Sequence, residues 1–384
     1  MKRIDRIKLI VRIQWLLLLI IAVACAPRPY ISVEVLPEYE ALFQDEKGWT
    51  GADGAYSIML SNETILWLFG DTWIGQIKGR RHVNTTLVNN SIALQHGRHA
   101  MNASVEFYYG QTLNDKPAAF FRSLEDRSWF WLYHGTRTAK GLYLFLMQIE
   151  RIDEESVFGF KTIGSWLGYV ANPEEPPPAW RISIRKIPWA TFTASSNTFF
   201  GSALLPLSDY FYIYGITEDI GEGFHRKYMI LARVPESGLD DFNQWRFFAE
   251  GRWTANFTEA SRLCANIANE YSVSYLPALK KYVMVYSENG ISRNIVARLA
   301  LQPYGPWSAP MLLYQCPEAN WDGSIFCYAA KAHSDISLNA DELIITYVAN
   351  STDFQKVAAD ARLYRPRFLR VRFLPQETIF LFGR

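Results

Sequence analysis

Three acidic residues occur where strands are expected to begin or end, and their chemistry suggests a first hypothesis. Asp53 precedes a predicted strand at 54–60, and Asp71 ends a predicted strand at 65–71. Because the strands of a hairpin run in opposite directions, both residues should reach the same edge. Two carboxyl groups held close in a partly dry cleft repel each other, so one keeps a proton while the other is ionised. Hydrolysis of a glycosidic bond needs such an acid beside such a base.

The expected roles of the carboxyl groups differ. We expect Asp53 to act as base or nucleophile, and Asp71 to act as the acid or to orient and tune a third group. The alternative for Asp71 is a turn residue whose side chain bonds its own backbone. Glu270, which opens a predicted strand at 270–276, is the expected third carboxylate, and Glu288 could replace it. The alternative for Glu270 is an exposed residue that merely leads its strand.

Several other residues could bind a substrate near these strand ends. Lys331 and His333 lie two residues apart in a predicted strand, so they face the same side. Lys331 could hold a sugar hydroxyl or lower the pKa of an acid, whereas His333 could also be a hydrogen-bonded structural imidazole. Arg365 fits a brace for a carboxylate better than a substrate contact. Asn90 is equally ordinary as a turn residue, and Trp73 could stack on a sugar ring or pack in the core.

The elements that must position these residues recur five times along the chain. Each repeat has an extended segment after a turn, an aromatic or apolar strand and a third apolar strand, at intervals of 61 to 81 residues. This period fits a propeller blade of four strands and is too long for a helical solenoid unit. We therefore predict an all-β fold, a five-bladed β-propeller, as a single domain over residues 26–384.

The predicted strands follow from these repeats. The first strands are 54–60, 118–123, 199–205, 270–276 and 328–334; the second are 65–71, 129–135, 210–216, 282–288 and 342–350. The third strands are 90–95, 141–149, 227–234, 294–300 and 367–373. Fourth strands are expected at 105–109, 181–187, 245–248 and 310–314, and the last blade could be closed by 379–383 or by 31–36. Either closure removes a free sheet edge.

Composition limits the partners of this domain. Aromatic residues make up 15% and charged residues only 20% of the chain, which suits sheets stacked face to face. A formal net charge of +1 argues against nucleic acid as a partner. The sequence contains no nucleotide fingerprint or paired metal-ligand spacing, so we expect no cofactor and no metal. We expect a monomer.

The amino terminus has the pattern of an export signal. Basic residues precede a short apolar run, and residues 22–25 (AVAC) resemble a bacterial lipobox. We therefore predict a lipoprotein signal peptide at 1–25, with Cys25 as the lipid acceptor and the protein anchored in the bacterial cell envelope. An uncleaved anchor is the alternative. Because export leads to an oxidising compartment, we predict a disulfide between Cys316 and Cys327, which leaves Cys264 as a buried thiol.

Several short runs resemble a known family. They are residues 51–57 (GADGAYS), 67–73 (WLFGDTW) and 89–91 (NNS), followed by 200–203, 270–273, 330–333 and 364–368. Together they resemble a bacterial domain-of-unknown-function family of exported five-bladed propellers that includes endo-D-arabinanases. The resemblance implies glycan chemistry on furanose-containing polysaccharides by carboxylates near the propeller axis.

The sequence thus predicts an exported glycoside hydrolase that acts on a polysaccharide or oligosaccharide, with Asp53, Asp71 and Glu270 as its catalytic residues. One alternative is a surface lipoprotein that binds glycan in the same cleft without cleaving it. Another is a structural or protein-binding propeller, because a fold by itself does not establish chemistry.

Overall fold

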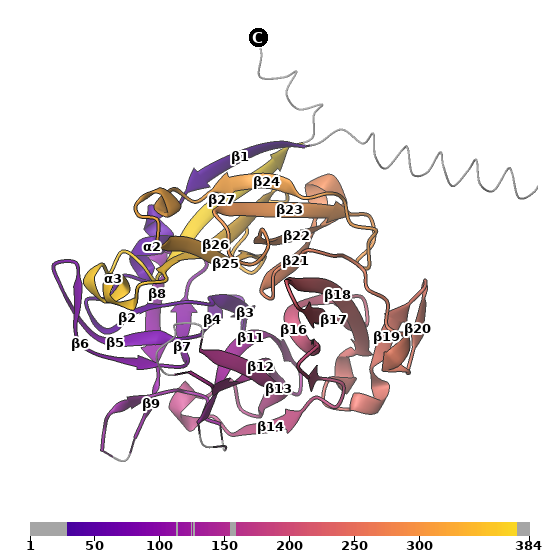
Figure 1. Cartoon of the computed structure of the whole chain (residues 1–384), viewed down its shortest axis with the longest axis horizontal. Coiled ribbons are helices and arrows are strands. Elements are labelled where there is room, and N and C mark those ends of the chain that lie inside the picture. The colour runs from indigo at the N-terminus through magenta and orange to yellow at the C-terminus, as the bar shows by residue number, and fades with distance from the viewer. Residues whose placement is uncertain (1–28, 113, 124, 126, 154–158, 375–384) are drawn as a thin grey trace, which may run out of the picture.

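Most of the regular secondary structure in the described part of the chain is β-strand. The computed structural model describes residues 29–374 except 113, 124, 126 and 154–158 (Figure 1). Within these residues the α-helices are α2 (Pro37–Leu42) and α3 (Phe354–Ala359), of six residues each. No helix in this part of the chain has the length and apolar character needed to cross a membrane. The predicted all-β class is confirmed.

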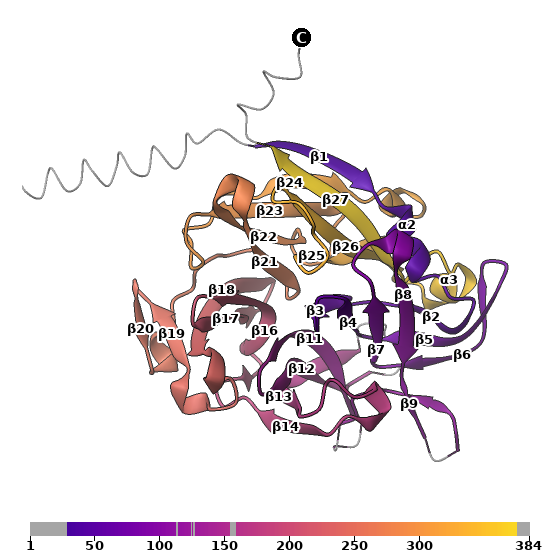
Figure 2. The ribbon, with the colours of Figure 1, turned by 180° about the vertical axis from the view of Figure 1, so that it is seen from behind.

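Five antiparallel sheets of four or more strands surround a common centre, seen from opposite sides in Figures 1 and 2. The inner strands of the five sheets contact one another in a closed cycle. In order, they are β3 (Tyr56–Met59), β11 (Ser128–Thr138), β16 (Ser196–Leu207), β21 (Tyr271–Leu276), β25 (Ile325–His333) and again β3. In pairing order, the first sheet is β3 (Tyr56–Met59), β4 (Thr64–Phe69), β7 (Ser91–His96) and β8 (Ser104–Tyr108). The second is β11 (Ser128–Thr138), β12 (Gly141–Arg151), β13 (Phe160–Val170) and β14 (Ile182–Lys186).

The other three sheets complete the ring. The third is β15 (Thr191–Phe192), β16 (Ser196–Leu207), β17 (Tyr210–Gly221), β18 (Phe224–Pro235), β19 (Arg246–Ala249) and β20 (Arg252–Thr254). The fourth is β21 (Tyr271–Leu276), β22 (Lys281–Ser287), β23 (Asn294–Ala300) and β24 (Met311–Gln315). The fifth is β25 (Ile325–His333), β26 (Glu342–Ser351), β27 (Pro366–Leu374) and β1 (Tyr30–Val35).

The fifth sheet joins the two ends of the described chain. Strand β1 pairs antiparallel with β27, from Tyr30 opposite Leu374 to Val35 opposite Leu369. This pairing is the closure by residues 31–36, one of the two that the sequence allowed. The other, at 379–383, lies outside the described residues. Because β1 pairs with β27, the backbone groups on that side of β27 are hydrogen-bonded and do not form a free sheet edge.

The inner strand of the second sheet differs from the one predicted. The first strand was expected at 118–123, but β11 at the centre of the ring is the strand predicted as the second one. The backbone N–H and C=O of Phe121 bond the buried side chain of Asn90 instead of a neighbouring strand. The third strand of this sheet is β13, which the sequence analysis did not predict. Its two glycines and its mixed polar and apolar residues weaken the strand pattern.

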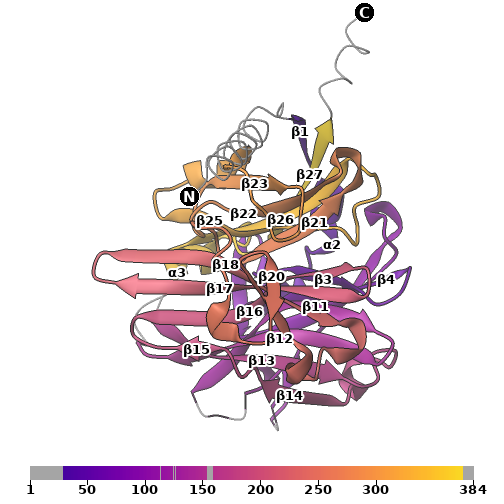
Figure 3. The ribbon, with the colours of Figure 1, turned by 90° about the vertical axis from the view of Figure 1, so that its right-hand side faces the viewer.

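A small additional sheet covers the region after Asp71. It consists of β2 (Lys47–Ala52), β5 (Thr72–Lys78) and β6 (Arg81–Val88), and was not predicted. A two-residue ladder also joins β9 (Gly110–Gln111) to β10 (Pro117–Ala118). In the side view of Figure 3 the hairpin of β17 and β18 projects beyond its neighbours, and both of its strands have twelve residues. The beginning of β18 therefore reaches one end of the ring.

Buried apolar side chains fill the spaces between the sheets. A cluster around Leu144, Ile213 and Met284 extends from the first sheet to the fourth. A separate cluster that includes Val285 and Ile345 lies between the fourth and fifth sheets. Aromatic rings contribute strongly, as Trp49 and Phe107 stack with centroids 4.4 Å apart. This packing holds the inner strands in place, and with them the residues at their ends.

Candidate active site

A cavity of about 310 Å³, named the large cavity, lies at one end of the ring. Its lining comes from all five sheets and the segments that join them, and includes Asp53, Asp71 and Glu270. The three carboxylates expected from the sequence therefore share one cavity. Its walls are otherwise apolar or aromatic, with a few convergent polar groups, which is the usual character of a small-molecule site.

The first hairpin brings Asp53 and Asp71 together. Strands β3 and β4 pair with Tyr56 opposite Leu68, and the same register extended outward places the two aspartates opposite each other. The amide of Asp53 donates to the carbonyl of Asp71 over 3.3 Å. The amide of Gly70 donates to the carbonyl of Asp53 over 3.0 Å. A Cβ at position 70 would collide with Asp53 Oδ1, so this approach requires glycine.

Two tyrosine hydroxyls donate to the same oxygen of Asp53. Tyr328 Oη is 2.6 Å and Tyr364 Oη is 3.0 Å from Asp53 Oδ2. Burial and the negative charge of Asp71 raise the pKa of Asp53 to about 8, although the hydrogen bond from Tyr328 opposes this shift. At neutral pH the carboxyl group of Asp53 is therefore mostly protonated.

Asp71 has a different set of partners. Trp131 Nε1 donates to Asp71 Oδ1 over 3.0 Å, and Asn89 Nδ2 donates to the same oxygen over 3.4 Å. Burial raises the pKa of Asp71 to about 6, and the hydrogen bonds from Trp131 and Asn89 oppose that rise. At neutral pH Asp71 is mostly ionised, so these two neighbouring carboxyl groups hold about one proton between them.

Glu270 is paired with a buried lysine. Lys331 Nζ lies 2.9 Å from Glu270 Oε1 and also donates to the carbonyl oxygens of Ala329, at 2.8 Å, and of Gly54. The Lys331 side chain is only 1% exposed, so each of its three N–H groups has a protein acceptor. Burial lowers the pKa of Lys331, and the charge of Glu270 opposes this. Lys331 thus braces Glu270 rather than reaching into the large cavity.

Lys227, on β18 of the third sheet, lines the large cavity. Lys227 Nζ is 3.7 Å from Glu218 Oε1, which is longer than a hydrogen bond. Glu218 Oε2 already accepts a hydrogen bond from Asn197 at 2.8 Å. Lys227 is 20% exposed and lies near Gly290, across the boundary between the third and fourth sheets. Of the described residues that line the large cavity, it is the one lysine or arginine.

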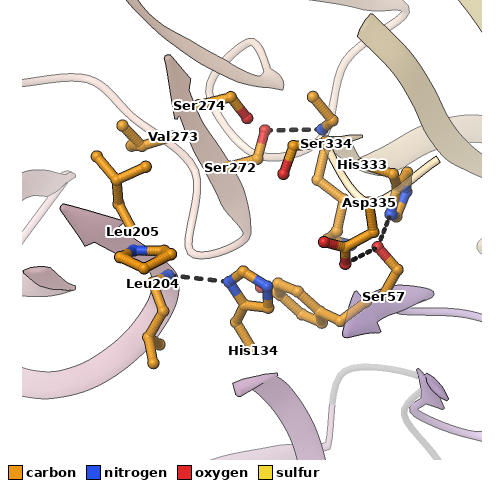
Figure 4. A pocket seen from close by; sticks show the side chains of 14 residues that line it. Ser57, His134, Leu204, Leu205, Ser272, Val273, Ser274, His333, Ser334 and Asp335 are labelled. Atoms are coloured by element: carbon orange, nitrogen blue, oxygen red, sulfur yellow. Dashed lines mark hydrogen bonds between the residues drawn. The ribbon is translucent and has the colours of Figure 1, made fainter. Parts of the chain in front are cut away.

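His333 lines a separate cavity of about 40 Å³, shown in Figure 4 and named the small cavity. Its Nδ1 is 2.9 Å from Ser57 Oγ and its Nε2 is 2.7 Å from Thr346 Oγ1. Ser57 Oγ also donates to Asp335 Oδ2 over 3.2 Å. Burial lowers the pKa of His333 well below its ordinary range. These contacts agree with the alternative interpretation of His333, in which its imidazole ring has a structural role and is held by hydrogen bonds.

Three other expected substrate contacts do not line the large cavity. Trp73 is 5% exposed and stacks on His82, with centroids 4.9 Å apart. Asn90 is fully buried and bonds the backbones of Phe121 and Phe130. Arg365 Nε donates to the carbonyl of Thr50 over 3.3 Å. The additional sheet and the irregular segment before β11, neither of which was predicted, bury Trp73 and Asn90 and leave Arg365 half-buried.

The three described cysteines lie inside the protein. Cys316 and Cys327 are fully buried and carry free thiols in this structure, and their expected disulfide stays a prediction. Both are packed in the apolar cluster between the fourth and fifth sheets, away from solvent. Cys264 is a buried free thiol, as expected. Cys25 lies outside the described residues, which contain no cluster of three potential metal ligands.

Four residues at the large cavity were not recognised from the sequence as site residues, namely Tyr328, Tyr364, Trp131 and Lys227. Tyr364 begins a run that contributed to the family resemblance, and Trp131 lies in an aromatic strand. An aromatic-rich strand does not reveal which ring faces a cavity. Their partners are far away in the sequence, so local patterns contain little information about them.

Comparison with known proteins supports the fold. A protein from Bacteroides ovatus, provisionally assigned as a hydrolase, has a similar structure with a TM-score of 0.70 and 19% identity, over 94% of this chain and 95% of its own. A thermostable family-43 glycoside hydrolase matches with a TM-score of 0.44 and 14% identity, over 84% of this chain and 88% of its own. The similarity to the Bacteroides ovatus protein establishes the fold.

A family model described as "Domain of unknown function (DUF5005)" matches residues 37–374. No curated protein matches the chain. The expected resemblance to a domain-of-unknown-function family is thus confirmed at that level. The finer part of the resemblance, a relationship to endo-D-arabinanases, stays a prediction.

Proposed function

The chain belongs to the DUF5005 family, and we propose that it is an exported glycoside hydrolase in which the five sheets are the blades of a β-propeller. The observation that carries this proposal is the pair of adjacent aspartates, Asp53 and Asp71, in the large cavity. The pair combines a carboxyl group that is protonated at neutral pH with one that is ionised. Glycosidic bond hydrolysis uses both forms at once.

In the proposed mechanism Asp53 is the acid. Its Oδ2 accepts from Tyr328 and Tyr364, so the proton is carried by Oδ1. As the bond between the anomeric carbon and the leaving oxygen breaks, Oδ1 gives its proton to that oxygen. This role reverses the expectation from the sequence, in which Asp53 was the base. The reason is that burial and the charge of Asp71 raise the pKa of Asp53 more than that of Asp71.

Asp71 is the ionised partner in this proposal. It either accepts a proton from the water that attacks the anomeric carbon or attacks that carbon directly. The indole N–H of Trp131 and the amide of Asn89 orient its carboxylate through Oδ1. Glu270 is held and partly neutralised by Lys331, and its remaining partial negative charge would favour the positive charge developing on the sugar ring.

The walls of the large cavity suit a sugar. The ring of Trp131 lies beside Phe160, with centroids 4.7 Å apart, and both rings line the cavity. Aromatic faces pack well against the C–H groups of a sugar ring. Lys227 can donate to a sugar hydroxyl because its nearest carboxylate oxygen, on Glu218, lies beyond hydrogen-bond distance. We propose an oligosaccharide or polysaccharide substrate, furanose-containing as the family resemblance implies.

The location of the enzyme is also part of the proposal. The basic and apolar pattern of residues 1–25 supports export, lipidation of Cys25 and attachment to the membrane of a bacterial cell envelope. Mass spectrometry of the mature protein tests this directly. A diacylated or triacylated Cys25 at the amino terminus is expected, and an intact Met1 would contradict it.

A substrate screen tests the activity. Purified protein is incubated with furanose and pyranose polysaccharides, and released reducing sugar is measured for the wild type, Asp53→Asn, Asp71→Asn and the exposed-loop control Asp115→Asn. We expect turnover in the wild type and the control, and a loss of about 10²- to 10⁴-fold in the two site variants. Binding of a glycan without release of sugar would instead favour the non-catalytic glycan-binding lipoprotein.

A further inference from the structure

We propose that Tyr328 and Tyr364 are positioning residues that together orient the Asp53 carboxyl group, so that Oδ1 is the oxygen presented to the glycosidic bond. This inference rests on the proposed function and assigns a role to two side chains that the sequence did not mark as site residues. Neither hydroxyl needs to touch the substrate, since both act through Asp53.

The two hydrogen bonds to one oxygen of Asp53 are the basis of this inference. Both hydroxyls converge on Oδ2, at 2.6 Å from Tyr328 and 3.0 Å from Tyr364. A single donor would hold Oδ2 at one contact only, so the carboxyl group could tilt about that contact. Two donors from different directions on one oxygen select one rotamer. In that rotamer Oδ1 lies against Gly70, the residue that precedes Asp71, and both Gly70 and Asp71 line the large cavity.

Neighbouring residues hold each tyrosine in place. Asn350 Nδ2 donates to Tyr328 Oη over 3.5 Å, near the upper limit for a hydrogen bond. The amide of Tyr364 donates to the carbonyl of Ala349 over 2.8 Å. The Tyr364 ring is 7% exposed and packs in a small apolar cluster with Trp73 and Val357. Rigid support of this kind is what a positioning role requires.

The backbone around the acidic pair is strained in a way that serves these contacts. Tyr364 has a φ of 59°, Ala329 has a φ of 59° and Ala55 has a φ of 55°, although none of them is glycine. Such conformations are unfavourable for residues other than glycine and persist only where the surroundings impose them. Ala329 lies in the bulge between Tyr328 and Lys331, which lets one side chain reach Asp53 and the other Glu270. Strain therefore coincides with the contacts to the carboxylates.

The test removes each hydroxyl and keeps each ring. Tyr328→Phe, Tyr364→Phe and the double variant are compared with the wild type and with Tyr275→Phe, whose ring is 45% exposed in the same fold. The kinetic probe is the polysaccharide found in the substrate screen. We expect kcat to fall about 10- to 100-fold in each single variant while KM stays within about twofold, because the acid is misplaced but the sugar contacts remain.

A second measurement does not depend on turnover. Protein labelled with ¹³C at the aspartate carboxyl carbon is titrated by NMR, and the Asp53 signal is assigned from its loss in Asp53→Asn. Removing a donor to Oδ2 weakens the ionised form, so the pKa of Asp53 should rise in each variant, and most in the double variant. If the wild type binds glycan without cleaving it, the proposed hydrolase fails while this titration still tests the contacts.

Two results would overturn the inference. One is an Asp53 titration that is the same in the wild type and the double variant, which would show that the hydroxyls do not act on this carboxyl group. The other is a full loss of activity caused by unfolding, revealed by a melting temperature that falls in Tyr328→Phe and Tyr364→Phe but not in Tyr275→Phe. In that case the hydroxyls support the fold rather than the acid.

Discussion

The amide of Asp53 donates to the carbonyl of Asp71 over 3.3 Å. The two residues whose carboxyl groups we assign to catalysis are therefore also backbone hydrogen-bond partners in one hairpin. This bond fixes the spacing of their Cα atoms and leaves only the side-chain torsions to set the distance between the carboxyl groups. The fold therefore keeps the two carboxyl groups close enough to repel each other when both are ionised. Both the activity and the stability of the protein should respond to the protonation of this pair.

The dependence of activity on pH should be bell-shaped. Asp71 must be ionised and Asp53 must be protonated, and their pKa values are about 6 and about 8. We expect kcat/KM to rise through pH 6, to reach a maximum near pH 7 and to fall above pH 8, measured between pH 4 and pH 10. Activity that keeps increasing to pH 10 would exclude Asp53 as the acid.

Stability should fall as the pH rises through the same region. The pKa of Asp53 is raised from 3.8 in the unfolded chain to about 8 in the folded protein, so the folded state binds more protons in between. The free energy of unfolding therefore decreases with rising pH, by at most about 1.4 kcal/mol per pH unit and by less with solvent screening.

Asp53→Asn removes this dependence. Between pH 7 and pH 8.5 its melting temperature should stay nearly constant while that of the wild type falls. The window is chosen because Asp71, Asp335 and the buried His134 titrate at lower pH, with pKa values of about 6, 6 and 4. Equal slopes for the two proteins in this window would contradict the raised pKa of Asp53.

Gly70→Ala should disable the site without unfolding the protein. The new Cβ would collide with Asp53 Oδ1 and would come 3.7 Å from Trp131 Cδ1. We expect displacement of the carboxyl group and a loss of kcat of about 10²-fold, with an unchanged circular dichroism spectrum. The matched control is Gly323→Ala, because a Cβ there meets nothing within 4 Å. A Gly70→Ala variant as active as the control would show that the close approach has no function.

Asn90→Ala should affect stability rather than substrate binding. Its side chain donates to the carbonyls of Phe121 and Phe130 at 2.9 and 2.8 Å and accepts from the amide of Phe121 at 2.8 Å. Loss of this buried side chain leaves backbone groups unpaired, at a cost of about 1 to 3 kcal/mol or more in the free energy of unfolding. Urea unfolding measures the cost, with the exposed Asn62→Ala as control. A large rise in KM without a loss of stability would restore Asn90 as a substrate contact.

Most strands could be predicted because each one has a local pattern. The third strand of the fourth sheet was predicted at 294–300 and is β23 (Asn294–Ala300), since it contains a short run of apolar residues that the sheet buries. The failure at 118–123 has a physical reason as well. An apolar pair such as Phe120 and Phe121 fits a strand, but the side chain of Asn90 satisfies the backbone of Phe121 instead. Competition between a side chain and a strand for the same backbone groups depends on distant residues.

The sequence by itself determined that Asp53 and Asp71 meet, because they close a single hairpin whose register follows from local strand periodicity. Only the tertiary structure decided which of the two carries the proton. That depends on burial and on hydroxyls that are 275 and 311 residues away in the chain, on Tyr328 and Tyr364. Closure of the ring brings the first and fifth sheets together, and the electrostatic environment of a carboxyl group is set by whatever surrounds it in space.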